Sequence, residues 1–186
     1  MKFIVRDFDL RLTLECGQAF RWQRQPDRAY LGVVGRHVVR AAQRAGALEL
    51  EGAPAETLRH YFQLDADLAS IITTFPKDEP MRRAVAYCRG MRLLRQDPWE
   101  TLASFICSAT KQIVQIRQIV ANLCRALGEP LRKSEGRNPE AEIEHAFPSV
   151  SAVARATHEE LLACKLGFRA KNLLGAARMI DAGEVR

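Results

Sequence analysis

The sequence lacks clustered cysteine and histidine residues, which argues against a metal site or a disulfide framework. Its 5 cysteines are scattered without a C-x-x-C pair, and its 4 histidines are isolated from them. Zinc ligands normally recur at short spacing, so we expect no metal ion. Scattered cysteines on apolar segments instead indicate buried, reduced thiols.

Long apolar runs and familiar cofactor motifs are also missing. No stretch approaches the roughly 18 apolar residues of a membrane-spanning helix, and the apolar run at residues 3–5 is too short for a signal peptide. The sequence contains neither G-x-x-x-x-G-K-[ST] nor G-x-S-x-G, so spacing predicts no cofactor and no self-sufficient catalytic site. These absences predict a soluble, cytoplasmic or otherwise intracellular protein that is not secreted and has no membrane partner.

Positive charge is concentrated in the second half of the chain. The net charge is +6, from 28 basic and 22 acidic residues. Residues 1–80 hold 11 of each kind, whereas residues 81–186 hold 17 basic and 11 acidic residues. A basic surface on one domain favours a polyanionic partner, with nucleic acid first; a solvated basic face without a partner is the alternative.

The first fifty residues alternate between apolar and polar positions, which predicts a small antiparallel sheet. Phe20 and Trp22 would share one face of a strand, so we expect both in the core rather than stacked on a ligand. The expected strands are residues 3–5, 10–14, 19–24, 30–34, 37–40 and 47–50.

Apolar residues recur at helical spacing from residue 55 onward, and a polar segment bracketed by prolines at residues 76–80 marks the best boundary in the chain. We therefore predict two domains, residues 1–79 with the sheet and residues 80–186 all helical. The expected elements of the second domain are helices at 81–88, 113–127, 149–156 and 170–180, a helix that follows Thr157 and ends at Gly167 in a left-handed cap, and a surface loop at 131–146.

One helix organises the second domain. Asp97 suits the N-cap, Pro98 suits the first helical position, and Glu100 follows at capping-box spacing. Leu102 and Phe105 lie at helical spacing, so we expect a buried helix. It leads into the polar run at residues 108–112, which would present amide, hydroxyl and ammonium groups to a ligand.

Five segments together resemble the 8-oxoguanine DNA glycosylase/AP lyase family of the helix-hairpin-helix glycosylases. They occur in the family's order across nearly the whole chain: residues 17–22 (GQAFRW), 61–65 (YFQLD), 92–100 (RLLRQDPWE), 104–108 (SFICS) and 166–171 (LGFRAK). The resemblance implies an α+β fold, in which a TATA-binding-protein-like antiparallel sheet with flanking helices precedes an incomplete all-helical glycosylase domain. It also implies a monomer that binds double-stranded DNA containing 8-oxoguanine, in the nucleoid of a bacterial-type cell.

The resemblance assigns roles to three residues near the ends of these segments. Gly17 matches the glycine whose carbonyl senses the hydrogen on N7 of 8-oxoguanine; a plain turn glycine is the alternative. Phe168 and Arg169 match an aromatic wedge and an arginine that reads the base opposite the lesion. A core phenylalanine and a phosphate-binding arginine are the alternative there.

The polar run departs from the family pattern. Thr110, Lys111 and Gln112 fall where many members carry three asparagines at the DNA minor groove, and Gln115 falls where many have an arginine that contacts the estranged base. We expect all four to contact DNA. For Lys111, the simpler alternative is a contact with a backbone phosphate that has no base specificity.

The chemistry of the family requires parts that this sequence does not show. A G-V-G-x-K hairpin, its lysine that attacks C1′ and a downstream aspartate are absent, so we expect no catalytic residue in this chain. Two functional hypotheses follow: the N-terminal part of an 8-oxoguanine DNA glycosylase/AP lyase, or a non-catalytic damaged-DNA-binding module. An interaction domain without nucleic acid is a third.

Overall fold

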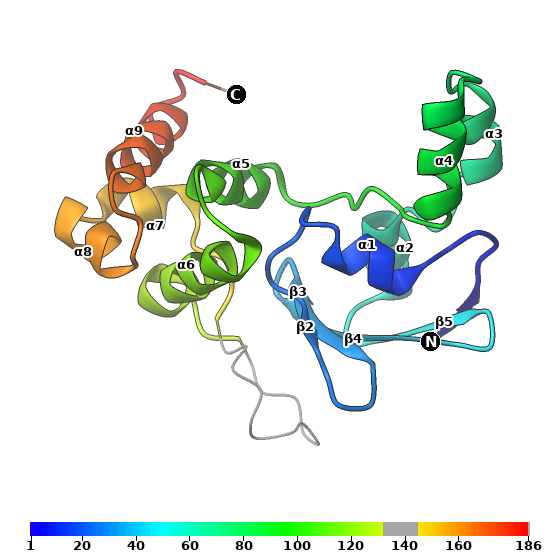
Figure 1. The fold of residues 1–186 in the computed structure, drawn as a ribbon. Helices are drawn as coiled ribbons and strands as arrows, with labels where there is room; N and C mark the ends of the chain where they lie inside the picture. The colour runs from blue at the N-terminus through cyan, green and yellow to red at the C-terminus, as the bar shows by residue number, and fades with distance from the viewer. Residues whose placement is uncertain (132–144, 186) are drawn as a thin grey trace. The chain divides into compact units, whose positions relative to one another are not determined.

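The computed structural model describes residues 1–131 and 145–185, so the predicted loop at 131–146 lies largely outside the described residues (Figure 1). Contacts divide the chain into two compact units. One comprises residues 1–34 and 38–95, and the other comprises residues 35–37 and 96–186. The domain boundary between residues 79 and 80 stays a prediction; by contacts, residues 80–95 group with the first unit.

The first unit is built on a five-stranded sheet with the strand order β1-β5-β4-β3-β2. The pairs β1–β5, β4–β5 and β2–β3 are antiparallel, as the alternating pattern predicted. The strands are β1 (Lys2–Ile4), β2 (Gln23–Arg24), β3 (Tyr30–Val34), β4 (His37–Arg44) and β5 (Ala47–Glu51). The helices of this unit are α1 (Leu10–Glu15), α2 (Ala55–Phe62), α3 (Leu68–Thr73) and α4 (Glu79–Tyr87).

The strand predicted at residues 10–14 is wrong, because this segment is the helix α1. The Asp9 carboxylate accepts a hydrogen bond from the backbone N–H of Leu12 at 2.7 Å and so caps the helix. The buried residues are Leu10, Thr13 and Leu14, which is a helical spacing. Leu10 and Leu14 lie four residues apart, so they share a face in a helix as well as in a strand, and five residues are too few to distinguish the two structures.

The strand predicted at residues 19–24 shrinks to β2, which holds only two residues. Trp22 lies just before β2 and is buried, as expected, whereas Phe20 is only half-buried. The indole N–H of Trp22 donates to the hydroxyl of Tyr61 at 3.0 Å, and its ring packs against Phe62 with centroids 5.7 Å apart. These aromatic side chains from a loop and from α2 form the centre of the core of the first unit.

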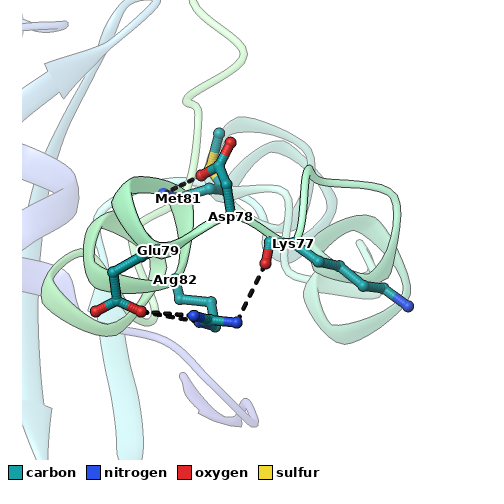
Figure 2. A network of polar contacts seen from close by, with 5 residues as sticks. All are labelled: Lys77, Asp78, Glu79, Met81 and Arg82. Carbon is teal, nitrogen blue, oxygen red and sulfur yellow. Dashed lines mark hydrogen bonds and ion pairs between the residues drawn. The ribbon is translucent and has the colours of Figure 1, made fainter.

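The polar segment at residues 76–80 forms the start of α4 (Figure 2). The Asp78 carboxylate accepts a hydrogen bond from the backbone N–H of Met81 at 2.8 Å. Arg82 donates to the Glu79 carboxylate at 2.7 Å and to the carbonyl of Lys77 at 3.2 Å. The cap and the ion pair therefore begin the helix at Glu79, two residues earlier than predicted.

The second unit is helical in the part that the structure describes. Its helices are α5 (Pro98–Ser108), α6 (Ile113–Leu127), α7 (Val150–Arg155), α8 (His158–Ala163) and α9 (Arg169–Asp181). Asp97 caps α5 by accepting from the backbone N–H of Glu100 at 2.9 Å, and Pro98 takes the first position, as predicted. The predicted bounds of α6 are confirmed.

The buried face of α5 differs from the prediction. Its buried residues are Ala103, Ser104 and Cys107, whereas Phe105 is 73% exposed and Leu102 is 39% exposed. Ala103 and Cys107 face the core that α5 shares with α6, α7, α8 and α9, and Trp99 and Ile106 pack against its edge. Leu102 and Phe105 face solvent. Helical spacing identified an apolar helix, but it did not identify which of its faces is covered.

The left-handed helix end predicted at Gly167 is also wrong. Helix α8 starts with the predicted capping box of Thr157 and Glu160, but it ends at Ala163. Lys165 and Gly167 then both have positive φ angles, +68° and +59°. The chain turns through these two residues into α9.

The cysteines are free thiols, and three of them are buried as predicted. Cys107, Cys124 and Cys164 are buried, Cys88 is half-buried, and Cys16 is exposed, which the sequence did not indicate. Burial disfavours the thiolate and raises the pKa of Cys107 to about 12. Cys107 therefore acts as a core residue.

Candidate nucleic-acid interface

A tight turn joins α5 to α6 and carries three of the predicted contact residues, Thr110, Lys111 and Gln112, and the fourth, Gln115, lies in the first turn of α6. The backbone N–H of Lys111 donates to the carbonyl of Ser108 at 3.0 Å, which closes the turn. Thr110 has a φ of +55°, a conformation that β-branched residues rarely adopt. Gln112 then begins α6, and its backbone N–H donates to the side-chain oxygen of Gln115 at 3.2 Å.

The turn presents polar groups outward. Thr110, Gln112 and Gln115 are exposed, and Lys111 is half-buried. The 15-residue helix α6 starts directly after the turn, so its N-terminal amides and the positive end of its dipole lie beside Lys111 in sequence. A hydroxyl, an ammonium group and amides at a helix N-terminus are groups that can bind a phosphate backbone, so DNA contact by these residues stays a prediction.

Phe168 and Arg169 adjoin each other at the start of α9 but differ in exposure. Phe168 is 64% exposed, whereas Arg169 is only 3% exposed. The guanidinium carbon of Arg169 lies 4.3 Å from the centroid of the Phe168 ring, which is a cation–π contact. Phe168 therefore has the exposure of a wedge, while Arg169 is enclosed by the protein.

The structure brings the α5–α6 turn and the start of α9 together through Arg169. Its guanidinium donates to the carbonyl of Ala109 through Nε at 2.7 Å and to the hydroxyl of Thr110 through Nη2 at 2.8 Å. It also donates to the carbonyl of Leu166 through Nη1 at 3.0 Å. Two of the predicted site residues, Thr110 and Arg169, are thus in direct contact within the second unit.

Gly17 belongs to the first unit and lies in the bend that follows α1. Its φ is +89°, in the left-handed region that glycine adopts without strain. This conformation suits both interpretations of Gly17, a turn glycine and a close backbone approach to a base. A side chain at this position would be strained in either case.

Gln18 is a residue that the sequence reasoning missed. Its side-chain amide donates to the carbonyls of Thr13 and Arg92, both at 2.8 Å, and its oxygen accepts from the backbone N–H of Leu94 at 2.8 Å. These bonds hold the bend at Gly17 against two other segments of the first unit. The sequence feature that could have identified Gln18 was its position next to Gly17 in the GQAFRW segment that resembles the family.

Phe105 and Val114 are a second omission. They flank the α5–α6 turn in sequence and are 73% and 75% exposed. The sequence reasoning placed Phe105 in the core and gave Val114 no role. Large apolar side chains beside a polar turn, together with exposed Phe168, give this unit an apolar as well as a polar surface.

Two further searches concern the described residues only. Among residues 1–131 and 145–185, no three or more His, Cys, Asp and Glu side chains gather where they could hold a metal ion. In the same part of the chain, every helix is too short or too polar to cross a bilayer.

Comparison with solved structures identifies the class of protein. The fold matches that of the Clostridium acetobutylicum 8-oxoguanine glycosylase/lyase in its apo-form, with a TM-score of 0.89 and 31% identity over 98% of this chain and 64% of that chain. A structure of the same enzyme with double-stranded DNA containing cytosine opposite 8-oxoG matches with a TM-score of 0.88 and 30% identity, over 100% of this chain and 67% of that chain. The sheet followed by helices is thus the fold of a DNA glycosylase.

Sequence comparison identifies the family. Residues 1–102 match the profile of the 8-oxoguanine DNA glycosylase N-terminal domain. The N-glycosylase/DNA lyase OGG1 of Arabidopsis thaliana is 30% identical over 192 aligned residues, which cover 98% of this chain and 51% of that protein. The chain belongs to the 8-oxoguanine DNA glycosylase family, and it spans about half the length of this plant relative.

Proposed function

We propose that this chain is the lesion- and DNA-binding part of an 8-oxoguanine DNA glycosylase with associated AP lyase activity, which acts in base-excision repair. The observation that carries the proposal is the family match over residues 1–102, which includes the sheet, Gly17 and the start of α5. The partner is double-stranded DNA that contains 8-oxoguanine. The protein acts as a monomer inside the cell, in association with the nucleoid, and needs no cofactor.

Gly17 is the lesion-sensing residue in this proposal. 8-Oxoguanine carries a hydrogen on N7 that guanine lacks, so a backbone carbonyl that accepts this hydrogen distinguishes the two bases. The left-handed backbone at Gly17 and the hydrogen bonds of Gln18 to three neighbouring backbone groups support a bend with a fixed geometry. A fixed acceptor discriminates better than a mobile one, since no ordering is required on binding.

The residues of the second unit hold the DNA. Thr110, Lys111, Gln112 and Gln115 face the backbone and the minor groove, and the exposed ring of Phe168 fills the stack when the damaged base leaves it. The net charge of +6 in residues 81–186 supports this assignment, because positive charge holds the phosphates while a base is extruded. The side-chain oxygen of Gln115 already accepts from Gln112, which weakens its case as a reader of the opposite base.

The chain contributes no catalytic residue in this proposal. Base removal and strand cleavage by this family require a lysine amine that attacks C1′ and an aspartate that assists the developing charge. Both would lie in the additional length that the relatives have and this chain does not. The alternative, a damaged-DNA-binding module, makes the same prediction for this chain alone.

The proposed function is tested by the lesion preference of the 186-residue chain. We expect it to bind a duplex with 8-oxoguanine opposite cytosine about tenfold or more tightly than the matched undamaged duplex, measured by fluorescence anisotropy. A Gly17→Ala variant should lose this preference because φ of +89° is unfavourable for alanine. Equal affinity of the parent chain for both duplexes would contradict lesion recognition, and no binding to either would favour an interaction domain without nucleic acid.

The affinity for DNA should depend on salt and on Lys111. With about three phosphate contacts, the association constant is expected to fall roughly 40-fold between about 50 and 200 mM salt, since each contact releases counterions. Lys111→Gln should reduce the slope of log affinity against log salt by about one unit.

The matched control for this prediction is Lys77→Gln. Lys77 lies in the neutral half of the chain, and its side chain points away from the network around Asp78 in Figure 2. This variant removes the same charge and should keep the parental slope. A slope that changes equally in both variants would show that total charge, rather than the α5–α6 turn, governs binding.

A further inference from the structure

Helix α1 ends at Glu15, where a carboxylate is unfavourable for the helix itself. The C-terminal end of a helix carries partial negative charge, so an acidic side chain is disfavoured there. Arg11, one turn earlier, lies 3.9 Å from the Glu15 carboxylate, but this pair is partly exposed and contributes little to stability. The helix alone therefore does not explain the placement of Glu15.

Tyr30, the first residue of β3, is the stronger partner of Glu15. Its hydroxyl donates to Oε1 of Glu15 at 2.6 Å, and its ring lies in the core of the first unit, with 4% of the residue exposed. A hydrogen bond to a carboxylate is shorter and stronger than one between neutral groups. Burial, and then the hydrogen bond to Glu15, raise the pKa of Tyr30, so the phenol keeps the proton that it donates. This bond anchors the end of α1 to the sheet.

The short length of α1 makes this anchor important. The helix has only six residues, whereas isolated helices shorter than about 12 residues are marginal in water. Its start is capped by Asp9, and Leu10, Thr13 and Leu14 are buried, but Glu15 at its end is only half-buried. The end of α1 therefore depends on the hydrogen bond from β3 more than its start does.

The bend at Gly17 directly follows this anchored end. Gly17 comes two residues after Glu15, and two residues span at most about 7 Å, so a displacement of the helix end is transmitted to the backbone of Gly17. On the other side of the bend, Gln18 is hydrogen-bonded to three backbone groups of the first unit. The bend is thus held before Gly17 through Tyr30 and after it through Gln18.

We propose that Tyr30 is a positioning residue for recognition of 8-oxoguanine: through Glu15 it holds the bend so that the carbonyl of Gly17 meets the damaged base at a fixed place. This inference rests on the proposed function, in which that carbonyl accepts the hydrogen on N7 of the lesion. Tyr30 acts through Glu15 and does not itself touch the base. Its contribution is preorganisation, since an acceptor that is already ordered needs no ordering on binding.

The anchor is tested first without DNA, by amide hydrogen exchange. Tyr30→Phe keeps the ring in the core and removes only the hydroxyl. We expect the amides of Leu14 and Glu15 to exchange about tenfold faster in this variant and in Glu15→Ala, because the last turn of α1 opens more often. Glu15→Gln should retain most of the protection, since its amide oxygen can still accept from the phenol.

The matched control is Tyr61→Phe. Tyr61 is 7% exposed in the same core, and its hydroxyl accepts from the indole N–H of Trp22 rather than from α1. This variant also removes one buried hydroxyl, but exchange at Leu14 and Glu15 should stay parental. Parental exchange at these two amides in both Tyr30→Phe and Glu15→Ala would overturn the inference.

The second arm measures lesion preference, the ratio of affinities for a duplex with 8-oxoguanine opposite cytosine and for the matched undamaged duplex. Tyr30→Phe and Glu15→Ala should each lower this ratio about threefold or more, while affinity for the undamaged duplex stays within about twofold of the parental value. The double variant should lose no more than either single variant, because both changes remove the same bond. Tyr61→Phe should keep the parental ratio.

The outcomes of the second arm separate this inference from the proposed function. A parental chain that prefers the lesion, together with folded Tyr30→Phe and Glu15→Ala variants that keep the full preference, would overturn the role of Tyr30. An equal loss in Tyr61→Phe would assign the effect to general loosening of the core and would overturn it too. A parental chain without any preference would overturn the proposed function and the lesion role of Tyr30 together, whereas the exchange measurement still decides the anchor. If Tyr30→Phe does not fold, Glu15→Ala at its half-buried position provides the same test.

Discussion

Borohydride added to the 186-residue chain on a duplex containing 8-oxoguanine is expected to trap no covalent complex. Trapping requires a Schiff base between a lysine amine and C1′ of the sugar, which the reductant converts to a stable amine. Three lysines of the described part of the second unit are candidates, and Lys165 and Lys171 are exposed while Lys111 is half-buried. None of these three side chains is buried in the core.

A complete relative supplies the positive control for this experiment. The Clostridium acetobutylicum 8-oxoguanine glycosylase/lyase should form a trapped complex on the same duplex, and an undamaged duplex should give none with either protein. If the present chain forms a complex, a catalytic lysine lies within it, and single Lys→Gln variants at positions 2, 77, 111, 133, 165 and 171, which are all the lysines of the sequence, would identify it. A longer chain that continues beyond Arg186 and carries a G-V-G-x-K hairpin should regain trapping.

The result also separates binding from chemistry. A chain that prefers the lesion duplex but yields no trapped complex binds the damage without carrying out the chemistry, and we propose that its affinity then comes from the Gly17 bend and the basic second unit. Base extrusion requires unstacking energy of a few kcal/mol, which only contacts made in the flipped state can offset. A chain that supplies only part of those contacts is expected to bind the lesion more weakly than the longer relatives do.

Local rules predicted some elements of this fold because their signals lie within a few residues. Asp97, Pro98 and the capping pair Thr157 and Glu160 each satisfy a helix N-terminus through neighbours at fixed spacing, and the structure confirms these starts. The pattern of α6 extends over 15 residues, long enough for the helical period to be unambiguous. The five residues of α1 that alternate were too few to distinguish a strand from a helix.

Contacts between segments that are distant in sequence determine which side chains are buried, and the sequence pattern could not indicate these contacts. Arg92 and Arg169 are 5% and 3% exposed, although arginines are mostly solvated, because backbone carbonyls from distant segments surround them. The exposed Phe105 shows the reverse case, an apolar residue at helical spacing that no element within residues 1–131 and 145–185 covers. The resemblance supplied the predicted positions of the candidate site, whereas the hydrogen bonds of Arg169 to Ala109, Thr110 and Leu166 are visible only in the structure.

Gly32→Ala is expected to destabilise the first unit by about 2–3 kcal/mol, the upper part of the range for overpacked cores. A Cβ on Gly32 in β3 would lie 2.4 Å from two ring atoms of Trp22 and 2.9 Å from a third. Trp22 is 2% exposed and bonded to Tyr61, so its ring has no free space to enter. Chemical denaturation followed by far-UV circular dichroism, a signal that does not depend on Trp22, measures the change, which should appear as a lower midpoint with the same slope.

Gly175→Ala is the matched control, because a Cβ there meets nothing within 4 Å in the exposed face of α9. An alanine inside a helix should stabilise by about 0.5–1 kcal/mol. The clash at Gly32 also predicts coupling: Gly32→Ala should be less destabilising in a Trp22→Leu background, since the smaller side chain leaves room for the added methyl group. Equal effects of Gly32→Ala in both backgrounds would mean that the indole ring is not what excludes a side chain from β3, and the close packing of Trp22 on this strand would have to be rejected.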